Sequence, residues 1–391
     1  MRRWRLIAAA AATVTAVAAA TAVALAATTF DAPATSNAAA DQTAISSSPA
    51  VSRAATPAPI TTNRPRAASA TRAATATSPA AKVTPVAANG KLHVCGVHLC
   101  NSGNRVVQLR GVSTHGLQFA PNCYHDAALD AIAGDWHADL LRIAMYVQEG
   151  GFETDQAGFT AKVNSLVDKA TARGLYALVD FHVLNPGDPT VNLERAKTFF
   201  ASVAKRNAGK TNVLYEIANE PNGVPWQTIK SYAEKVIPVI RAQDPDAIVV
   251  VGTRGFSSLG IAEGSNAGET IDNPLDFPNI MYAFHFYAAS HQDNYRAELT
   301  AAAARLPMFV TEFGTVTFTG NGTFDRASST TWLNLLDRLR ISYANWTFSD
   351  IDESSAALEP GTCSGSKYAG TSVLTESGAF IRSRLRASAS S

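Results

Sequence analysis

Residues 213–222 read VLYEIANEPN, an apolar run that is followed at once by Asn219 and Glu220. A run of four to eight apolar residues bounded by polar or turn-forming residues is typical of a buried strand. Similar runs lie before and after it, and longer stretches with apolar residues three and four positions apart separate them. In chain order the runs cover residues 106–110, 140–145, 176–180, 213–217, 248–251, 280–284, 308–311 and 343–346.

Strands that alternate with helices predict an α/β fold with a parallel sheet, and eight such units predict a closed (β/α)8 TIM barrel. The clearest helical pattern consists of Phe159, Val163, Leu166, Val167 and Ala170. A doubly wound open sheet is the alternative. It is disfavoured because residues 110–116, RGVSTHG, lack the glycine spacing of a dinucleotide-binding loop.

The composition changes along the chain and predicts three segments. Residues 1–30 begin with Arg2 and Arg3 and continue as an Ala- and Val-rich apolar run, which predicts a secretory signal peptide. An uncleaved membrane anchor is the alternative, but the many Ala and Thr residues make it a poor one. Residues 31–88 are rich in Ala, Thr, Pro and Ser and predict a disordered linker. The remaining residues, 89–391, have a suitable length for a single barrel domain.

The charge distribution restricts the partners of that domain. The whole chain has a formal charge of +1, but residues 1–89 hold eight Lys and Arg against two Asp and Glu, which leaves 25 against 30 in the remainder. A nucleic-acid partner would require a concentrated basic surface, and the pattern predicts none. We expect a secreted, extracellular monomer that acts on a neutral substrate and has no stable membrane partner.

The four cysteines predict two disulfides, because an exported chain enters an oxidising environment. Four cysteines allow three pairings. We favour Cys95 with Cys100, which closes a short turn, and Cys123 with Cys363, which joins the first βα loop to the last. A structural zinc site is the alternative, but the spacings lack the paired short gaps of such sites.

Polar and aromatic side chains lie at the ends of the predicted strands, where a barrel places its functional groups. They are His115, Arg142, Tyr146, His182, Asn219, Glu220, His285, Tyr287, Glu312 and Trp346. A single glutamate at a strand end is more often part of a structural ion pair than a catalyst. Two of them, Glu220 and Glu312, with Arg142 and three histidines at the same edge, favour a reactive pair.

Paired carboxyl groups suit the cleavage of glycosidic bonds, which needs one protonated carboxyl and one ionised carboxylate. A metal-dependent hydrolase built from His, Asp and Glu is the alternative. It is disfavoured because no His-x-His pair follows the first strand and because aromatic residues accompany the glutamates. Retention and inversion of configuration both stay open, since the sequence gives no distance between the two carboxyl groups.

Residues 216–222, EIANEPN, resemble the Asn-Glu-Pro signature of glycoside hydrolase family 5, particularly its actinobacterial-type endoglucanases, or cellulases. Residues 109–118, LRGVSTHGLQ, resemble the first-strand block of the family. Residues 285–288, HFYA, and 310–314, VTEFG, resemble the sixth and seventh blocks. These blocks occur in the family order, and the resemblance covers nearly all of residues 90–385.

The resemblance implies a retaining double displacement in which Glu220 is the acid/base and Glu312 the nucleophile. Arg142 and Tyr287 would keep Glu312 ionised, and the remaining strand-end residues would bind substrate. Among these, the resemblance assigns Asn219 to the sugar 2-hydroxyl, His285 to Glu220, and Trp346 to the floor of the reactive subsite, with His182 in the same shell. His115 and Tyr146, at neighbouring strand ends, are expected to bind substrate as well.

The resemblance also implies the substrate: internal β-1,4 bonds of cellulose, its soluble derivatives or cello-oligosaccharides, with no cofactor or metal. Related β-glucans and β-mannan are alternatives, as are a transferase that uses the same site and a catalytically silent carbohydrate-binding barrel. Four positions depart from the common family pattern. Phe119, Phe181 and Phe313 stand where many relatives have Trp, and Ile351 lies where some have a sugar-binding Lys.

Overall fold

The structure, a computed structural model, describes residues 83–388. The expected signal peptide, residues 1–30, lies outside the described residues, as does the expected linker up to residue 82. Within the described part, eight parallel strands close into a barrel in the order β10-β3-β4-β5-β6-β7-β8-β9. The predicted (β/α)8 barrel is therefore confirmed.

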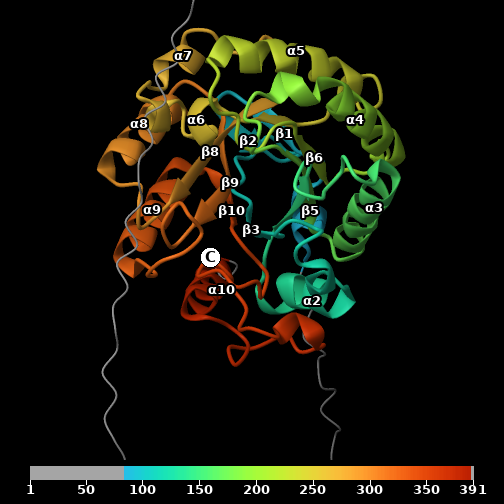
Figure 1. The fold of residues 1–391 in the computed structure, drawn as a ribbon, viewed down its shortest axis with the longest axis vertical. Helices are drawn as coiled ribbons and strands as arrows, with labels where there is room; N and C mark the ends of the chain where they lie inside the picture. The colour runs from blue at the N-terminus through green and yellow to red at the C-terminus, as the bar shows by residue number, and fades with distance from the viewer. Residues whose placement is uncertain (1–82, 389–391) are drawn as a thin grey trace, which may run out of the picture. The chain divides into compact units, whose positions relative to one another are not determined.

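The strands of the barrel form its inner wall, and helices surround them (Figure 1). The strands are β3 (Arg110–Ser113), β4 (Leu140–Tyr146), β5 (Tyr176–His182), β6 (Val213–Glu216), β7 (Val249–Val251), β8 (Ile280–Tyr287), β9 (Met308–Gly314) and β10 (Ser342–Asn345). The helices are α2 (Asp126–Asp130), α3 (Gln156–Ala172), α4 (Leu193–Asn207), α5 (Trp226–Arg241), α6 (Arg254–Ser257), α7 (Gly268–Ile271), α8 (Asp293–Ala303), α9 (Arg326–Leu339) and α10 (Glu376–Ser388).

Helix α3 forms where the spacing predicted it. Its buried residues are Phe159, Val163, Leu166, Val167 and Ala170, the five that define the apolar pattern in the sequence. Asp155 caps the helix, because its side chain accepts a hydrogen bond from the backbone N–H of Gly158. The spacing thus identified both the helix and the face that packs on the barrel.

Residues alternate between the two faces of the barrel wall, as successive residues of a strand must. In β4, Leu141 and Ile143 belong to the large apolar core between strands and helices, whereas Leu140 belongs to a separate apolar cluster inside the barrel. Arg142 shares the inward direction of Leu140. The inner cluster fills one end of the barrel, and the polar inward-facing residues occupy the other end.

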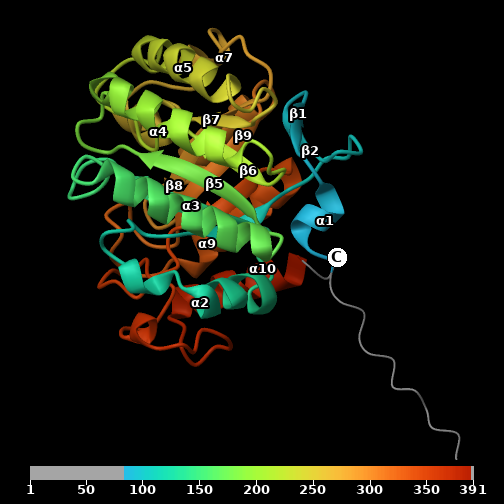
Figure 2. The same ribbon diagram turned by 90° about the vertical axis from the view of Figure 1, so that its right-hand side faces the viewer.

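A hairpin of β1 (His93–Cys95) and β2 (His98–Cys100) closes the apolar end of the barrel. Figure 2 shows this hairpin at one end of the barrel strands, together with α1 (Pro85–Asn89). Leu92 and Leu99 are buried there in the inner apolar cluster. The C-terminal ends of the strands and their loops therefore remain for a functional site.

Strand β9 contains one extra residue, a β-bulge. Tyr343 and Asn345 of β10 align with Val310 and Phe313 of β9, so two steps on one strand match three on the other. The same irregularity occurs against β8, between the pairs Ala283–Phe309 and His285–Glu312.

The bulge changes which side chains face the barrel interior. Val310 and Phe313 both pack in the large core between strands and helices, while Phe309 belongs to the inner cluster. The two residues of the bulge, Thr311 and Glu312, consequently both reach the barrel interior.

The first barrel strand lies later than predicted: the structure has β3 at Arg110–Ser113, not at residues 106–110. The apolar run instead covers the floor of the barrel, where Val106 forms a β-bridge with Cys100 and Leu109 joins the inner cluster. The true strand contains Gly111, where a Cβ atom would lie 2.1 Å from the carbonyl oxygen of Leu140. Only glycine leaves room for β3 and β4 to approach each other this closely. Strand β3 therefore contains a residue type that is a poor strand former, which is why the sequence pattern did not reveal it.

The folded unit also begins earlier than expected. Residues assigned to the linker form helix α1, Pro85–Asn89, which Thr84 caps by accepting a hydrogen bond from Ala87. The N–H of Val86 donates to the carbonyl oxygen of Gly174 at 3.0 Å, and its side chain packs on the inner apolar cluster. A capping Thr followed by Pro is a typical helix start, but these two residues are also common in linkers, so composition alone did not indicate the helix.

The two disulfides have the favoured pairing: Cys95 with Cys100 and Cys123 with Cys363. The second bond joins the loop after β3 to the loop after β10, across 240 positions of sequence. Among residues 83–388, no helix has both the length and the apolar character that crossing a bilayer requires.

Candidate active site

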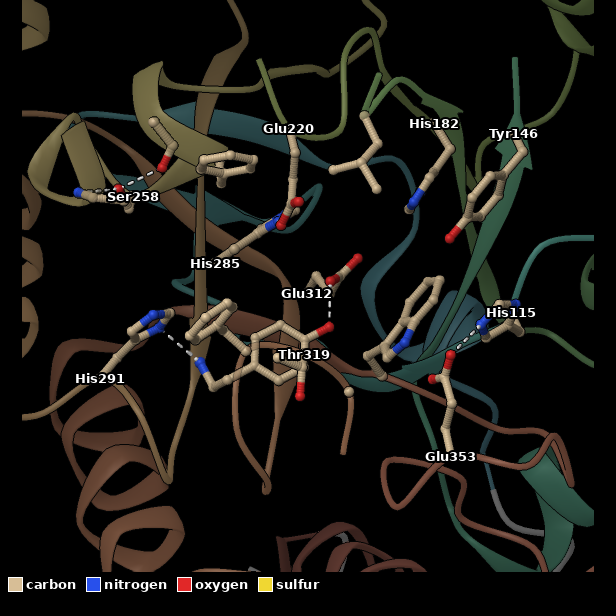
Figure 3. A pocket seen from close by; sticks show the side chains of 18 of the residues that line it. His115, Tyr146, His182, Glu220, Ser258, His285, His291, Glu312, Thr319 and Glu353 are labelled. Atoms are coloured by element: carbon tan, nitrogen blue, oxygen red, sulfur yellow. Dashed lines mark hydrogen bonds and ion pairs between the residues drawn. The ribbon is translucent and has the colours of Figure 1, made fainter. Parts of the chain in front are cut away.

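A cavity of about 650 Å³ lies at the C-terminal ends of the barrel strands. Figure 3 shows glutamates, histidines and aromatic side chains from different strands pointing into it. Eight of the ten residues selected from the sequence line the cavity, namely His115, Tyr146, His182, Glu220, His285, Tyr287, Glu312 and Trp346. The other two, Arg142 and Asn219, are buried.

The guanidinium of Arg142, fully buried on β4, is surrounded by acceptors. Nε donates to Glu216 Oε2 at 2.7 Å, Nη1 to Glu312 Oε2 at 3.0 Å, and Nη2 to Asn219 Oδ1 at 2.5 Å. Nη2 also lies 3.0 Å from Asp180 Oδ2. Three buried carboxyl groups from β5, β6 and β9 therefore share one cation, which offsets part of the cost of removing them from water.

Glu312 is held in its ionised form. Oε2 accepts a hydrogen bond from Arg142, and Oε1 accepts one from the hydroxyl of Tyr287 at 2.8 Å. Burial by itself raises the pKa of Glu312, but the positive charges of His285 and Arg142 outweigh it and lower that pKa below its ordinary value. Gly314 provides space for Tyr287, since a Cβ at this position would lie 2.2 Å from the tyrosine ring. An ionised carboxylate aimed into the cavity suits nucleophilic attack.

Glu220 has the opposite tendency. Burial raises its pKa, a hydrogen bond with His285 opposes the rise, and the negative charge of Glu312 adds to it, so the pKa of Glu220 lies above the ordinary value. Oε1 lies 2.8 Å from Nδ1 of His285. Oxygen atoms of Glu220 and Glu312 come within 4.8 Å of each other. Two carboxyl groups with pKa values shifted apart face the same small volume.

Aromatic rings form the wall beside these carboxyl groups. The rings of Tyr146 and His182 stack with centroids 4.1 Å apart, and His182 stacks on Trp346 at 5.4 Å. Nδ1 of His182 donates to Asp180 Oδ2 at 2.7 Å, so Nε2 accepts from the side-chain amide of Asn219 at 3.2 Å. Burial, with the nearby charge of Arg142, lowers the pKa of His182 and keeps the ring neutral. The wall therefore offers flat apolar faces and no extra charge.

The four departures from the family pattern fall into two groups. Phe119 and Ile351 line the cavity, and Phe119 is 43% exposed. Phe181 and Phe313 are fully buried in the core between strands and helices. Only the first two are placed where they could contact a ligand.

Several residues of the site were not selected from the sequence. Glu216 and Thr311 lie beneath the cavity in the hydrogen-bond network, and Asp180 binds both Arg142 and His182. His291 and Glu353 line the cavity from loops. Glu216 had one available signal, because it is a charged residue inside an apolar run and on the inward-facing register of β6; the loop residues had none.

Within residues 83–388, two groups of side chains have the spacing of a metal site. In the first, Cys123 and Cys363 bond to each other, so their sulfur atoms cannot act as thiolate ligands. The second consists of Glu220, His285 and Glu312. Both oxygens of Glu312 already accept hydrogen bonds, one of them from a cationic guanidinium that would repel a metal ion. The arrangement fits paired carboxyl chemistry better than metal ligation.

The fold and the cavity define a class: a (β/α)8 barrel with a carboxyl pair and an aromatic wall at the C-terminal ends of its strands. The sequence model of the cellulase family, glycosyl hydrolase family 5, matches residues 100–352. The chain belongs to this family.

Named relatives agree with this assignment. Endoglucanase CelA of Streptomyces lividans is 65% identical over 299 residues, which are 76% of this chain and 65% of that protein. Endoglucanase E-5 of Thermobifida fusca is 55% identical over 298 residues, 76% of this chain and 64% of that protein. The match therefore spans slightly less than two thirds of the length of these curated relatives.

Solved structures show the same barrel. The catalytic domain of Thermobifida fusca endoglucanase Cel5A, in a variant bound to cellotetraose, aligns with a TM-score of 0.77 and 54% identity. The alignment covers 78% of this chain and 99% of that chain. The cavity described above thus belongs to a barrel whose similar relative binds a cello-oligosaccharide.

Proposed function

We propose that this chain is a secreted retaining endo-β-1,4-glucanase that hydrolyses internal bonds of cellulose and cello-oligosaccharides. The observation that supports it most strongly is the pair Glu220 and Glu312, with oxygens within 4.8 Å and pKa values shifted in opposite directions. Retaining glycosidases hold their carboxyl groups about 5–5.5 Å apart, whereas inverting ones need about 6.5–9.5 Å to admit a water. The short separation supports retention.

In the first step, the ionised carboxylate of Glu312 attacks the anomeric carbon. Glu220 donates its proton to the glycosidic oxygen, and the C–O bond to the leaving sugar breaks. Arg142 and Tyr287 hold Glu312 in place and keep it ionised until it forms the ester. The stacked wall of Tyr146, His182 and Trp346 offers a face for the reacting sugar ring.

In the second step, water attacks the anomeric carbon of the glycosyl ester. Glu220, now ionised, accepts a proton from that water, and Glu312 leaves as a carboxylate. The two inversions restore the original configuration, and both carboxyl groups return to their starting protonation states. Glu312 is the nucleophile of the first step and water that of the second, and the proton that Glu220 gives to the leaving sugar is returned by the attacking water, so the mechanism requires no cofactor.

The substrate assignment rests on the relatives and is tested by activity. Release of reducing sugar is measured from carboxymethyl cellulose and from glucomannan, with the wild type, Glu220→Gln and Glu312→Gln. Both variants are expected to lose about a thousandfold or more in rate, with the glucan preferred by the wild type. Substantial activity in both variants would contradict the carboxyl pair, and preference for glucomannan would contradict the substrate.

The two roles are separated by rescue with azide. Glu220→Ala lacks the acid/base, so with dinitrophenyl cellobioside it should still form the glycosyl ester, and azide should release a β-glycosyl azide. Glu312→Gly lacks the nucleophile, so azide should attack the substrate directly and give the α-glycosyl azide. Product configuration is read by NMR. The reverse pattern of products would show that the two roles are exchanged.

A further inference from the structure

Beneath the cavity, a chain of hydrogen bonds joins the two carboxyl groups of the proposed pair. From Glu312 it passes through Arg142 to Glu216, whose Oε1 accepts from the hydroxyl of Thr311 at 2.5 Å. Thr311 Oγ1 lies 2.8 Å from Nε2 of His285, and Nδ1 of His285 lies 2.8 Å from Glu220 Oε1. Thr311, Glu216 and Arg142 are fully buried, so these bonds are shielded from bulk solvent.

The directions of these bonds follow from the number of protons available. Burial raises the pKa of Glu216, but the charges of Arg142 and of His285, whose Nε2 lies 3.8 Å from Glu216 Oε1, lower it to about 2, so Glu216 is ionised and can only accept. The hydroxyl of Thr311 has one proton and donates it to Glu216. Its oxygen must then accept from His285, which requires a proton on Nε2.

A proton fixed on Nε2 determines what Nδ1 can do. In the neutral ring Nδ1 has a lone pair, and it can accept a hydrogen bond from protonated Glu220 but cannot donate to ionised Glu220. The pair His285–Glu220 therefore holds one shared proton, located either on the carboxyl or on Nδ1. If both lose it, two lone pairs face each other at 2.8 Å.

We propose that Thr311 is a positioning residue for the acid/base: its hydroxyl, oriented by Glu216, fixes the tautomer of His285 and so keeps a proton available to Glu220. This inference rests on the proposed function. Thr311 touches neither the substrate cavity nor Glu220; it acts through His285. Without the bulge in β9, Thr311 and Glu312 would point to opposite faces of the strand. The bulge turns both side chains inward, and so brings the Thr311 hydroxyl to His285.

The charges around His285 favour retention of that proton. Burial disfavours the charged ring, but Glu216 and Glu220 outweigh it and raise the pKa of His285 to about 9. The charged groups that face His285 or its partners come from five places: Arg142 on β4, Asp180 on β5, Glu216 on β6, Glu220 in the loop after β6, and Glu312 on β9. Burial raises the pKa of Asp180 well above its ordinary value, but the pKa values of Glu216 and Glu312 are lowered, and these two carboxylates outnumber the single guanidinium, so the surroundings are net negative.

Thr311→Val removes the hydroxyl at nearly constant volume, and Thr311→Ser retains it. Without the hydroxyl, the ring of His285 can move its proton to Nδ1 and donate to ionised Glu220, which stabilises the ionised acid/base. The alkaline limb of kcat/KM for methylumbelliferyl cellobioside is expected to move to lower pH by about one unit in Thr311→Val. Thr311→Ser is expected to restore the wild-type limb.

A comparison of leaving groups separates positioning from general damage. Dinitrophenolate leaves without acid assistance, so in Thr311→Val the kcat/KM for dinitrophenyl cellobioside should fall about tenfold less than that for methylumbelliferyl cellobioside. Titration with dinitrophenyl 2-deoxy-2-fluorocellobioside counts the sites that can form the glycosyl ester, which verifies that the variant is folded and that Glu312 is competent.

An unchanged alkaline limb in Thr311→Val would overturn the proposal, as would an equal loss on both substrates or a failure of Thr311→Ser to restore the limb. If the wild type itself released no dinitrophenolate in the titration, the proposed glycosidase function would fail. This result concerns the wild type alone, so it can be distinguished from the three outcomes for the Thr311 variants.

Discussion

At the residue scale, the site depends on one buried cation that serves several carboxyl groups. Arg142 contacts Asp180, Glu216 and Glu312, so the charge on each affects the others. When Glu312 becomes a neutral ester in the proposed reaction, Arg142 keeps two partners. The guanidinium is therefore expected to stay in place through the catalytic cycle, because a buried cation without partners would be very costly.

Tyr287→Phe tests the control of Glu312. The tyrosine hydroxyl donates to Glu312 Oε1, and its loss should raise the pKa of Glu312. Since the ionised form attacks in the proposed mechanism, the acid limb of kcat/KM should move to higher pH, by about one unit. Tyr343→Phe is the control, because the buried hydroxyl of Tyr343 has no hydrogen-bond partner among the described residues. A pH profile that changes equally in both variants would contradict this role.

Gly314→Ala tests the space left for Tyr287. A Cβ would lie 2.2 Å from the tyrosine ring, so the ring must move and its hydrogen bond to Glu312 must weaken. We expect kcat to fall by about tenfold, with a smaller change in KM. Gly209→Ala is the matched control, since a Cβ there has no neighbour within 4 Å. Equal kcat values for the two variants would be inconsistent with the steric argument.

The sequence could identify those site residues that follow a recognisable strand. Glu220 and Glu312 each come after an apolar run, and the structure brings them together in one cavity. Asp180 and Glu216 lie within the apolar runs, and their place beside Arg142 becomes evident only when the inward face of each strand is known. Loop residues such as His291 and Glu353 follow no periodic pattern, so nothing in the sequence located them.

At the element scale, most strands and helices agree with their periodicity, and the exceptions have physical causes. The first strand was misplaced because an apolar run can cover the floor of a barrel as well as form its wall. The bulge in β9 could not be predicted, since a register shift is defined relative to the neighbouring strands β8 and β10. Both features concern contacts between elements, which local periodicity does not report.

The disulfide that joins the loops after β3 and β10 should contribute substantially to stability. Replacing Cys123 and Cys363 by Ser should lower the free energy of unfolding by about 2–5 kcal/mol, because the bond restricts a long loop of the unfolded chain. The matched control replaces Cys95 and Cys100, which are five positions apart, and should lose less. Denaturant unfolding of both double variants measures the difference, and a larger loss in the control would refute the expectation.

At the scale of the whole barrel, the closed parallel architecture follows from the alternation of strands and helices, and this was predictable. The start of the folded unit was not, because the short helix α1 is stabilised by contacts with Gly174 and the barrel floor. A segment of ordinary linker composition becomes part of the domain when a surface exists for it to pack on.

The stability of the barrel should depend on pH through one of its buried histidines, His285. His285 has a pKa of about 9 in the folded protein against 6.5 ordinarily, so folding favours its protonated form. This contribution, about 3 kcal/mol, is fully present below pH 6.5 and is lost as the pH rises to 9. Thermal unfolding followed from pH 6.5 to 9.5 should show a falling Tm in the wild type and a flatter profile in His285→Gln. Parallel profiles would assign the decrease to other groups.

The bond between Cys123 and Cys363 has one more consequence, for the case in which a protease cuts the chain. It encloses most of the barrel, from the loop after β3 to the loop after β10, in one covalent ring. A single cut in any loop between these cysteines opens the ring but leaves both fragments attached to each other. Such a nicked barrel would migrate as one species on a denaturing gel until a reductant is added, because the disulfide still links its two fragments.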